Sequence, residues 1–118
     1  MKLKLSLIAL TGFLSLSCSS NSPDDLQGEV PENISYEADI KPIIQSNCLG
    51  CHAEPPVNGA PMPLTDYDKV KQAIQSRGLI DRISRAQGTE GMMPSGGTRL
   101  PENIIATIIK WRDQDFQP

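Results

Sequence analysis

The chain has 118 residues, a formal net charge of −3 and 38% hydrophobic residues, which suits a single domain. From residue 40 to the C-terminus, nine basic side chains nearly balance eight acidic ones. This part of the chain therefore lacks the basic face that nucleic-acid binding needs, and we expect no nucleic-acid partner.

Residues 1–17 show the features of a secretory signal peptide in the usual sequence order. Lys2 and Lys4 precede an apolar run over residues 5–16. That run is too short to span a bilayer and matches the apolar region of such a signal. We predict that residues 1–17 are a signal peptide and that the protein is exported to the cell envelope, to the periplasm or the outer surface.

Cys18 follows the small residues Ser15 and Ser17. The pattern "LSLSC" is similar to the lipidation signal of bacterial lipoproteins, although Ser15 stands where leucine is expected. Cleavage by ordinary signal peptidase is the alternative, but it would leave an exported free thiol. We therefore favour lipidation of Cys18, because two or three acyl chains give a stable membrane anchor.

Residues 18–35 are predicted to be a flexible acidic tether, because they are polar, contain Pro and Gly, and show no apolar period. From residue 18 to residue 39 the chain has six acidic and no basic side chains. The domain is then residues 36–118, which hold few aromatic residues. A core this small usually needs additional stabilisation, for example from disulfides or a metal. A large bound cofactor would provide it by adding apolar surface to the core.

Four helices and no strand are predicted, so the expected fold class is all-α. The first helix covers residues 36–49, because Ile40, Ile43 and Ile44 have the spacing of an amphipathic helix. Pro42 is tolerated if the regular helix begins near Asp39, because proline then lies in the first turn.

The other three helices follow a proline-rich loop. Thr65 is expected to cap the second helix, which ends at Gly78. The third helix covers residues 79–86. A glycine-rich loop separates it from the last helix, for which Pro101 is the expected first residue and residue 115 the approximate end.

The segment "CLGCH" contains Cys48, Cys51 and His52, the only histidine of the chain. The pattern C-x-x-C-H is the sequence mark of covalent c-type haem attachment. A thioredoxin-like dithiol would need a βαβ setting, with the motif at a helix N-terminus. A structural zinc site normally has four Cys or His ligands. We favour the haem interpretation, because strands and a fourth ligand are missing from the sequence pattern.

A six-coordinate haem needs a second axial ligand, and methionine is the usual alternative to histidine. Met62, Met92 and Met93 all lie in the two Pro- and Gly-rich loops. Met62 is only ten residues after His52 and is less able to reach the opposite face of a haem. The pair Met92 and Met93 follows about 40 residues after His52, which is enough chain to return on the other face.

Three segments together resemble the small class I cytochromes c. "NCLGCH" matches the haem motif of that family, which follows an N-terminal helix. "MMPSGG" is similar to the M-P-x-G-G loop of many bacterial cytochrome domains, and "IIATIIKWRDQ" resembles the C-terminal helix, with Trp111 near its usual aromatic position. The resemblance covers residues 36–116. It implies a cytochrome c-like fold, with about four helices around one covalently attached haem and the N- and C-terminal helices packed together.

The resemblance also implies a role for individual residues. Cys48 and Cys51 would form the two thioethers to the haem, and His52 would be the proximal axial iron ligand. Met93, which directly precedes a proline, would be the distal axial iron ligand. Met92 is the alternative at that position.

The function implied is electron transfer by a monomer with one haem c per chain, a carrier rather than an enzyme. Its partners would be redox proteins of the bacterial cell envelope, and the lipid on Cys18 would attach it to the membrane. The alternative is a haem-based sensor or a peroxidase-like protein, in which the sixth ligand is labile and exogenous ligands bind the iron.

We predict that Cys18→Ala releases the protein from the membrane fraction, because the substitution removes the attachment point of the acyl chains. Fractionation of cells that express wild-type or variant protein measures this. A variant that stays membrane-bound would show that the anchor is not a lipid on Cys18.

Overall fold

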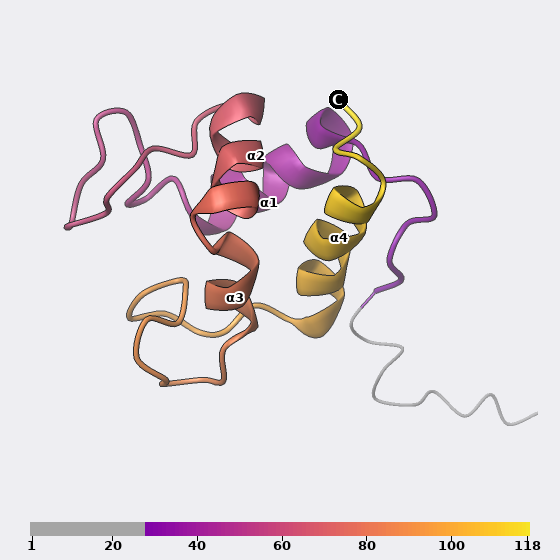
Figure 1. Ribbon diagram of the computed structural model, residues 1–118. Coiled ribbons are helices and arrows are strands. Elements are labelled where there is room, and N and C mark those ends of the chain that lie inside the picture. Colours follow the sequence, from indigo (N-terminus) through magenta and orange to yellow (C-terminus); the bar gives the residue numbers. More distant parts are fainter. Residues whose placement is uncertain (1–27) are drawn as a thin grey trace, which may run out of the picture.

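A computed structural model describes residues 28–118 (Figure 1). The predicted signal peptide, the lipidation of Cys18 and residues 18–27 of the predicted tether lie outside the described residues. The described part is helical and contains no strand, which agrees with the all-α class predicted from the sequence. Within it, no helix has the length and apolar character needed to cross a membrane.

The first helical segment begins as a π-helical turn, η2 (Tyr36–Ile40), and continues directly into α1 (Lys41–Asn47). The side chain of Ser35 accepts a hydrogen bond from the backbone N–H of Ala38, and Asp39 accepts one from the backbone N–H of Ser35. This reciprocal pair satisfies N–H groups that have no partner inside the helix. Pro42 lies in the first turn of α1, where its missing N–H costs nothing.

Helix α2 (Tyr67–Ser76) is capped by Asp66, so the prediction that Thr65 is the cap was wrong by one residue. Asp66 has extended backbone angles, and its Oδ1 accepts a hydrogen bond of 3.0 Å from the N–H of Lys69. The hydroxyl of Thr65 donates to the other carboxylate oxygen instead. The left-handed φ of 70° at Gly78 separates α2 from the next helix, and glycine adopts it without steric cost.

Helices α3 (Leu79–Ser84) and α4 (Glu102–Asp113) are both shorter than predicted. Arg85 is extended, with a ψ of 149°, so α3 ends two residues before the expected position. Pro101 is the capping residue of α4 rather than its first helical residue. Asp115 and Phe116 adopt positive φ angles of 57° and 55°, which turn the chain back and end α4 before residue 115.

The helices pack against one another in pairs: η2 contacts α4, α4 contacts α3, and α3 contacts α2. Trp111 on α4 is fully buried, and its ring lies 5.7 Å from those of Tyr36 and Tyr67 and 5.0 Å from that of Phe116. The N-terminal helical segment and the last helix are therefore joined through an aromatic cluster. The two long loops, residues 52–66 and 85–101, extend on the same side of the helices, at the left of Figure 1.

Residues 31–35, assigned to the tether from the sequence, lie against α4. Ile34 is 1% exposed, and its N–H donates to the side chain of Gln114 at 2.9 Å. Lys110 and Gln114 donate to the backbone carbonyls of Pro31 and Glu32. These residues therefore form part of the packed structure.

We predict that Asp66→Ala lowers the free energy of unfolding by about 1 kcal/mol, the usual cost of losing an N-cap side chain. Hydrogen bonds from the Lys69 side chain and backbone lower the pKa of Asp66 from its ordinary value of 3.8. The native state therefore favours the ionised carboxylate, so its stabilising contribution is present above that value and is lost as the pH falls below it. Urea unfolding at pH 7 and at acidic pH measures both effects.

Asp68→Ala is the matched control, because Asp68 lies in the first turn of the same helix and does not cap it. Equal destabilisation by the two substitutions would contradict the role given to Asp66.

Candidate functional site

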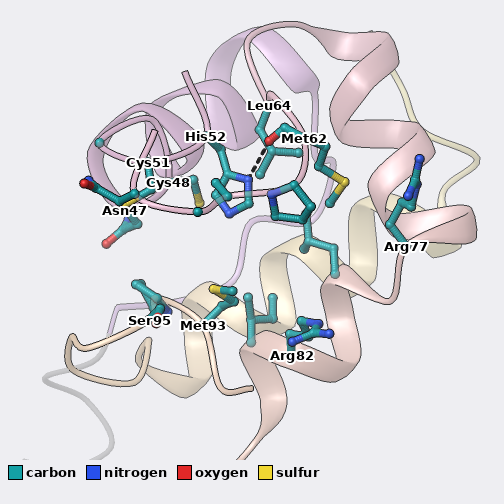
Figure 2. A pocket seen from close by; sticks show the side chains of 18 of the residues that line it. Asn47, Cys48, Cys51, His52, Met62, Leu64, Arg77, Arg82, Met93 and Ser95 are labelled. Atoms are coloured by element: carbon teal, nitrogen blue, oxygen red, sulfur yellow. Dashed lines mark hydrogen bonds between the residues drawn. The ribbon is translucent and has the colours of Figure 1, made fainter. Parts of the chain in front are cut away.

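A cavity of about 500 Å³ lies between the loop that follows α1 and the loop between α3 and α4 (Figure 2). Its volume is in the range of small-molecule and cofactor sites. Another part of its wall comes from the C-cap of α2, Arg77, and from three residues of α3, Leu79, Arg82 and Ile83. The four residues expected to hold a haem all line it: Cys48, Cys51, His52 and Met93.

The end of α1 places the C-x-x-C-H residues at the cavity. The N–H of Cys48 donates to the carbonyl of Ile44 and completes the last turn of the helix. The N–H groups of Cys51 and His52 both donate to the carbonyl of Cys48, at 3.1 and 2.9 Å. This tight turn presents the two thiols and the imidazole to one cavity, and both thiols are free and half-buried.

His52 is buried, and its ring is oriented by a backbone carbonyl. Its Nδ1 lies 2.7 Å from the carbonyl oxygen of Met62 (dashed in Figure 2). A carbonyl can only accept, so Nδ1 carries the proton and Nε2 keeps its lone pair. This is the form in which imidazole binds a metal, and a carbonyl acceptor behind the ring fixes its tautomer. The N–H of Leu64 donates to the carbonyl of His52 at 2.8 Å and holds the same loop from its other end.

The structure separates the two candidate methionines. Met93 is half-buried and lines the cavity on the side opposite to His52 (Figure 2). Met92 is 6% exposed and is not among the lining residues. Their backbone N–H groups also donate to different carbonyls, that of Arg82 for Met93 and that of Thr89 for Met92.

Met62 also lines the cavity, but it stands on the same side as His52, whose ring it orients through its own carbonyl. The sequence identified Met62 only as a weak ligand candidate. Its role as a hydrogen-bond acceptor could not be found from residue types, because every residue has a backbone carbonyl.

Among residues 28–118, the charged side chains that line the cavity are Arg77 and Arg82, and no Asp or Glu lines it. The cavity therefore has a positive edge, which suits an anionic or carboxylate-bearing ligand. The two arginines belong to different segments, Arg77 at the C-cap of α2 and Arg82 on α3, and the turn at Gly78 lies between them.

Burial raises the pKa of the Cys48 thiol to about 11. Reactive dithiols of the C-x-x-C type instead have a lowered thiol pKa, produced by a helix N-terminus or by neighbouring cations. Cys48 stands at the C-terminal end of α1, where the helix dipole disfavours a thiolate. This environment argues against the thioredoxin-like alternative.

Within residues 28–118, no three or more His, Cys, Asp and Glu side chains are grouped so as to hold a metal ion. No protein-family model, curated protein or solved structure matches the chain.

Proposed function

We propose that the protein is a monohaem c-type cytochrome of the cell envelope that transfers electrons. The observation that carries this proposal is the convergence of Cys48, Cys51, His52 and Met93 on one cavity. Two thiols at C-x-x-C spacing, an adjacent imidazole and a thioether on the opposite side are the groups that covalent haem attachment and His/Met ligation require.

Three further features of the cavity fit a haem. Its walls are formed largely by apolar side chains and by Pro and Gly, which suits a porphyrin ring. His52 has the tautomer that leaves Nε2 available as a ligand. Arg77 and Arg82 match in charge the two carboxylates that a haem carries, because guanidinium groups bind carboxylates well.

Each residue would have a distinct part in electron transfer. When bound, haem supplies a one-electron redox couple at its iron. Cys48 and Cys51 would hold it by two thioether bonds at the end of α1. His52 would donate its Nε2 lone pair, made more basic by the Met62 carbonyl behind the ring. Met93, which lines the cavity on the side opposite to His52, would supply a second iron ligand, and His/Met ligation raises the reduction potential.

The cavity lining gives less support to acid–base catalysis. Among the described residues no carboxylate lines the cavity, and its single imidazole has only Nε2 free of the backbone, the atom that the proposal assigns to the iron. A general acid or base must reach the proton that it moves. The lining of the cavity therefore favours an electron carrier over a hydrolytic or proton-transfer enzyme.

We predict that the protein, produced together with a haem-maturation system, carries one haem that acid–acetone does not extract. The reason is that two thioethers join the haem to the chain through Cys48 and Cys51. A double variant, Cys48→Ala with Cys51→Ala, is the control and should yield no covalently bound haem. Wild-type protein whose haem is fully extracted would contradict the proposal and would leave the thiol and zinc alternatives open.

We also predict that Met93→Ala loses the Met–iron charge-transfer band and binds carbon monoxide rapidly in the reduced state. Met92→Ala should keep the band, because Met92 is buried outside the cavity lining. The Met92→Ala substitution should instead lower the free energy of unfolding by about 2–5 kcal/mol, as other substitutions of buried methionine by alanine do.

Absorption spectra of both redox states and denaturant unfolding measure these effects. The reverse pattern would make Met92 the ligand. Rapid carbon monoxide binding by the wild-type protein at neutral pH would favour the sensor or peroxidase-like alternative, in which the sixth ligand is labile.

A further inference from the structure

The loop of residues 85–101 carries Met93 and contains four glycines and two prolines. Loops of this composition are usually mobile, and a mobile loop would leave Met93 a labile ligand. Here, however, arginine side chains bind the backbone of this loop and of the helix before it. They are Arg82, Arg85 and Arg99.

Arg85 connects α3 to the loop just before the methionines. Its Nε and Nη2 donate to one carboxylate oxygen of Asp81, at 3.2 and 2.7 Å. Its Nη1 donates to the backbone carbonyl of Glu90 at 2.7 Å. Because the guanidinium is planar and rigid, the carboxylate of Asp81 fixes the direction in which Nη1 points. The ion pair between Arg85 and Asp81 on α3 therefore orients the hydrogen bond that holds the loop.

Arg82 binds the loop on both sides of Met92. Its Nη1 donates to the carbonyl of Gly91 at 3.3 Å, and its own carbonyl accepts the N–H of Met93 at 3.1 Å. The second bond connects the backbone of the proposed ligand directly to α3. It fixes the position from which the Met93 side chain enters the cavity.

Arg99 closes the other end of the loop. Its Nε and Nη2 donate to the carbonyls of Arg85 and Ser84, at 3.0 and 3.3 Å. These carbonyls lie at the C-terminal end of α3, where a helix leaves carbonyl groups without partners. Nη1 of Arg99 also pairs with Glu102 on α4 at 2.6 Å. The loop is therefore fastened to both helices that it joins.

Gly91 shows how closely the arginines approach the loop backbone. A Cβ atom at this position would overlap Nη1 of Arg85 and would lie 2.9 Å from Nη1 of Arg82. Gly88, in the same loop, has a similar left-handed φ, 78° against 73°, but nothing lies within 4 Å of its Cβ position. A side chain at residue 91 would therefore displace two guanidinium groups, whereas one at residue 88 would displace nothing.

We propose that Arg82 and Arg85 are positioning residues that keep Met93 at the cavity, and that they thereby close the sixth iron position to exogenous ligands. This inference rests on the proposed function. Hydrogen bonds from charged donors are among the stronger ones in proteins. Three hydrogen bonds with Arg82 and Arg85 hold the consecutive stretch from Glu90 to Met93. A movement of the loop that takes Met93 away from the cavity would therefore break more than one of these bonds.

The test compares Gly91→Ala with Gly88→Ala in the haem-loaded protein. Both changes place alanine at a left-handed φ, so both carry the same backbone strain. Only Gly91→Ala disturbs the guanidinium groups. We expect carbon monoxide to bind the reduced Gly91→Ala protein at least about tenfold faster than the Gly88→Ala protein, the effect that loss of one charged hydrogen bond can produce. The Met–iron charge-transfer band should weaken in the same variant.

Arg85→Gln provides a second comparison that leaves the glycines intact. Its control is Arg112→Gln, which breaks an exposed ion pair with Asp113 on α4, outside the loop. Arg85→Gln should also speed carbon monoxide binding, and Arg112→Gln should not. Urea unfolding separates the two roles, because a merely structural effect would lower the unfolding midpoint and leave the binding rate in native conditions unchanged.

Faster binding in Gly91→Ala and Arg85→Gln than in their controls would support the inference. Equal rates within both pairs, with a normal charge-transfer band in the wild-type protein, would overturn the inference alone. A wild-type protein without that band would instead overturn His/Met ligation in the proposed function, and this inference with it.

Discussion

The packing of Trp111 is the interaction on which the rest of the structure depends. Four aromatic side chains lie within residues 28–118. The rings of the other three, Tyr36, Tyr67 and Phe116, all pack against the ring of Trp111. The polar tips of Trp111 and Tyr67 donate to carbonyls of the C-terminal segment, at 2.7 Å in both cases. The indole of Trp111 and the phenol of Tyr67 therefore keep hydrogen-bond partners although their rings are packed in the cluster, which is the usual condition for burying these side chains. The cluster fixes α4 against the N-terminal helical segment.

None of these rings lines the cavity, so the largest side chains of the domain stabilise a different region. A group bound in the cavity would add apolar contacts in a region that the aromatic cluster does not reach. A covalently attached porphyrin would explain why a chain with so few aromatic residues can fold.

The sequence predicted the features that depend on residue types at fixed spacing. Examples are the apolar stripe of the first helix, the C-x-x-C-H turn and the presence of methionines in a glycine-rich loop. It could not predict features that depend on backbone acceptors, such as the Met62 carbonyl behind His52 or the Glu90 carbonyl that binds Arg85. Every residue has a carbonyl, so such partners have no sequence signature. The cap of α2 shows a third case, since Thr65 and Asp66 are both good caps and only the backbone angles decide between them.

Composition alone also misjudges the two loops around the cavity. Both are rich in Pro and Gly, yet each is fastened by specific bonds. Residues 52–66 are held by His52 through its ring and its carbonyl, and by the ion pair of Glu54 with Lys69 on α2 at 2.9 Å. Residues 85–101 are held by arginines from α3 and from the loop itself. If the proposed function holds, the choice between an electron carrier and a ligand-binding haem protein would depend on whether Met93 can leave the iron. The inferred role of Arg82 and Arg85 would then make the hydrogen bonds of the loop backbone, rather than the methionine itself, decide that choice.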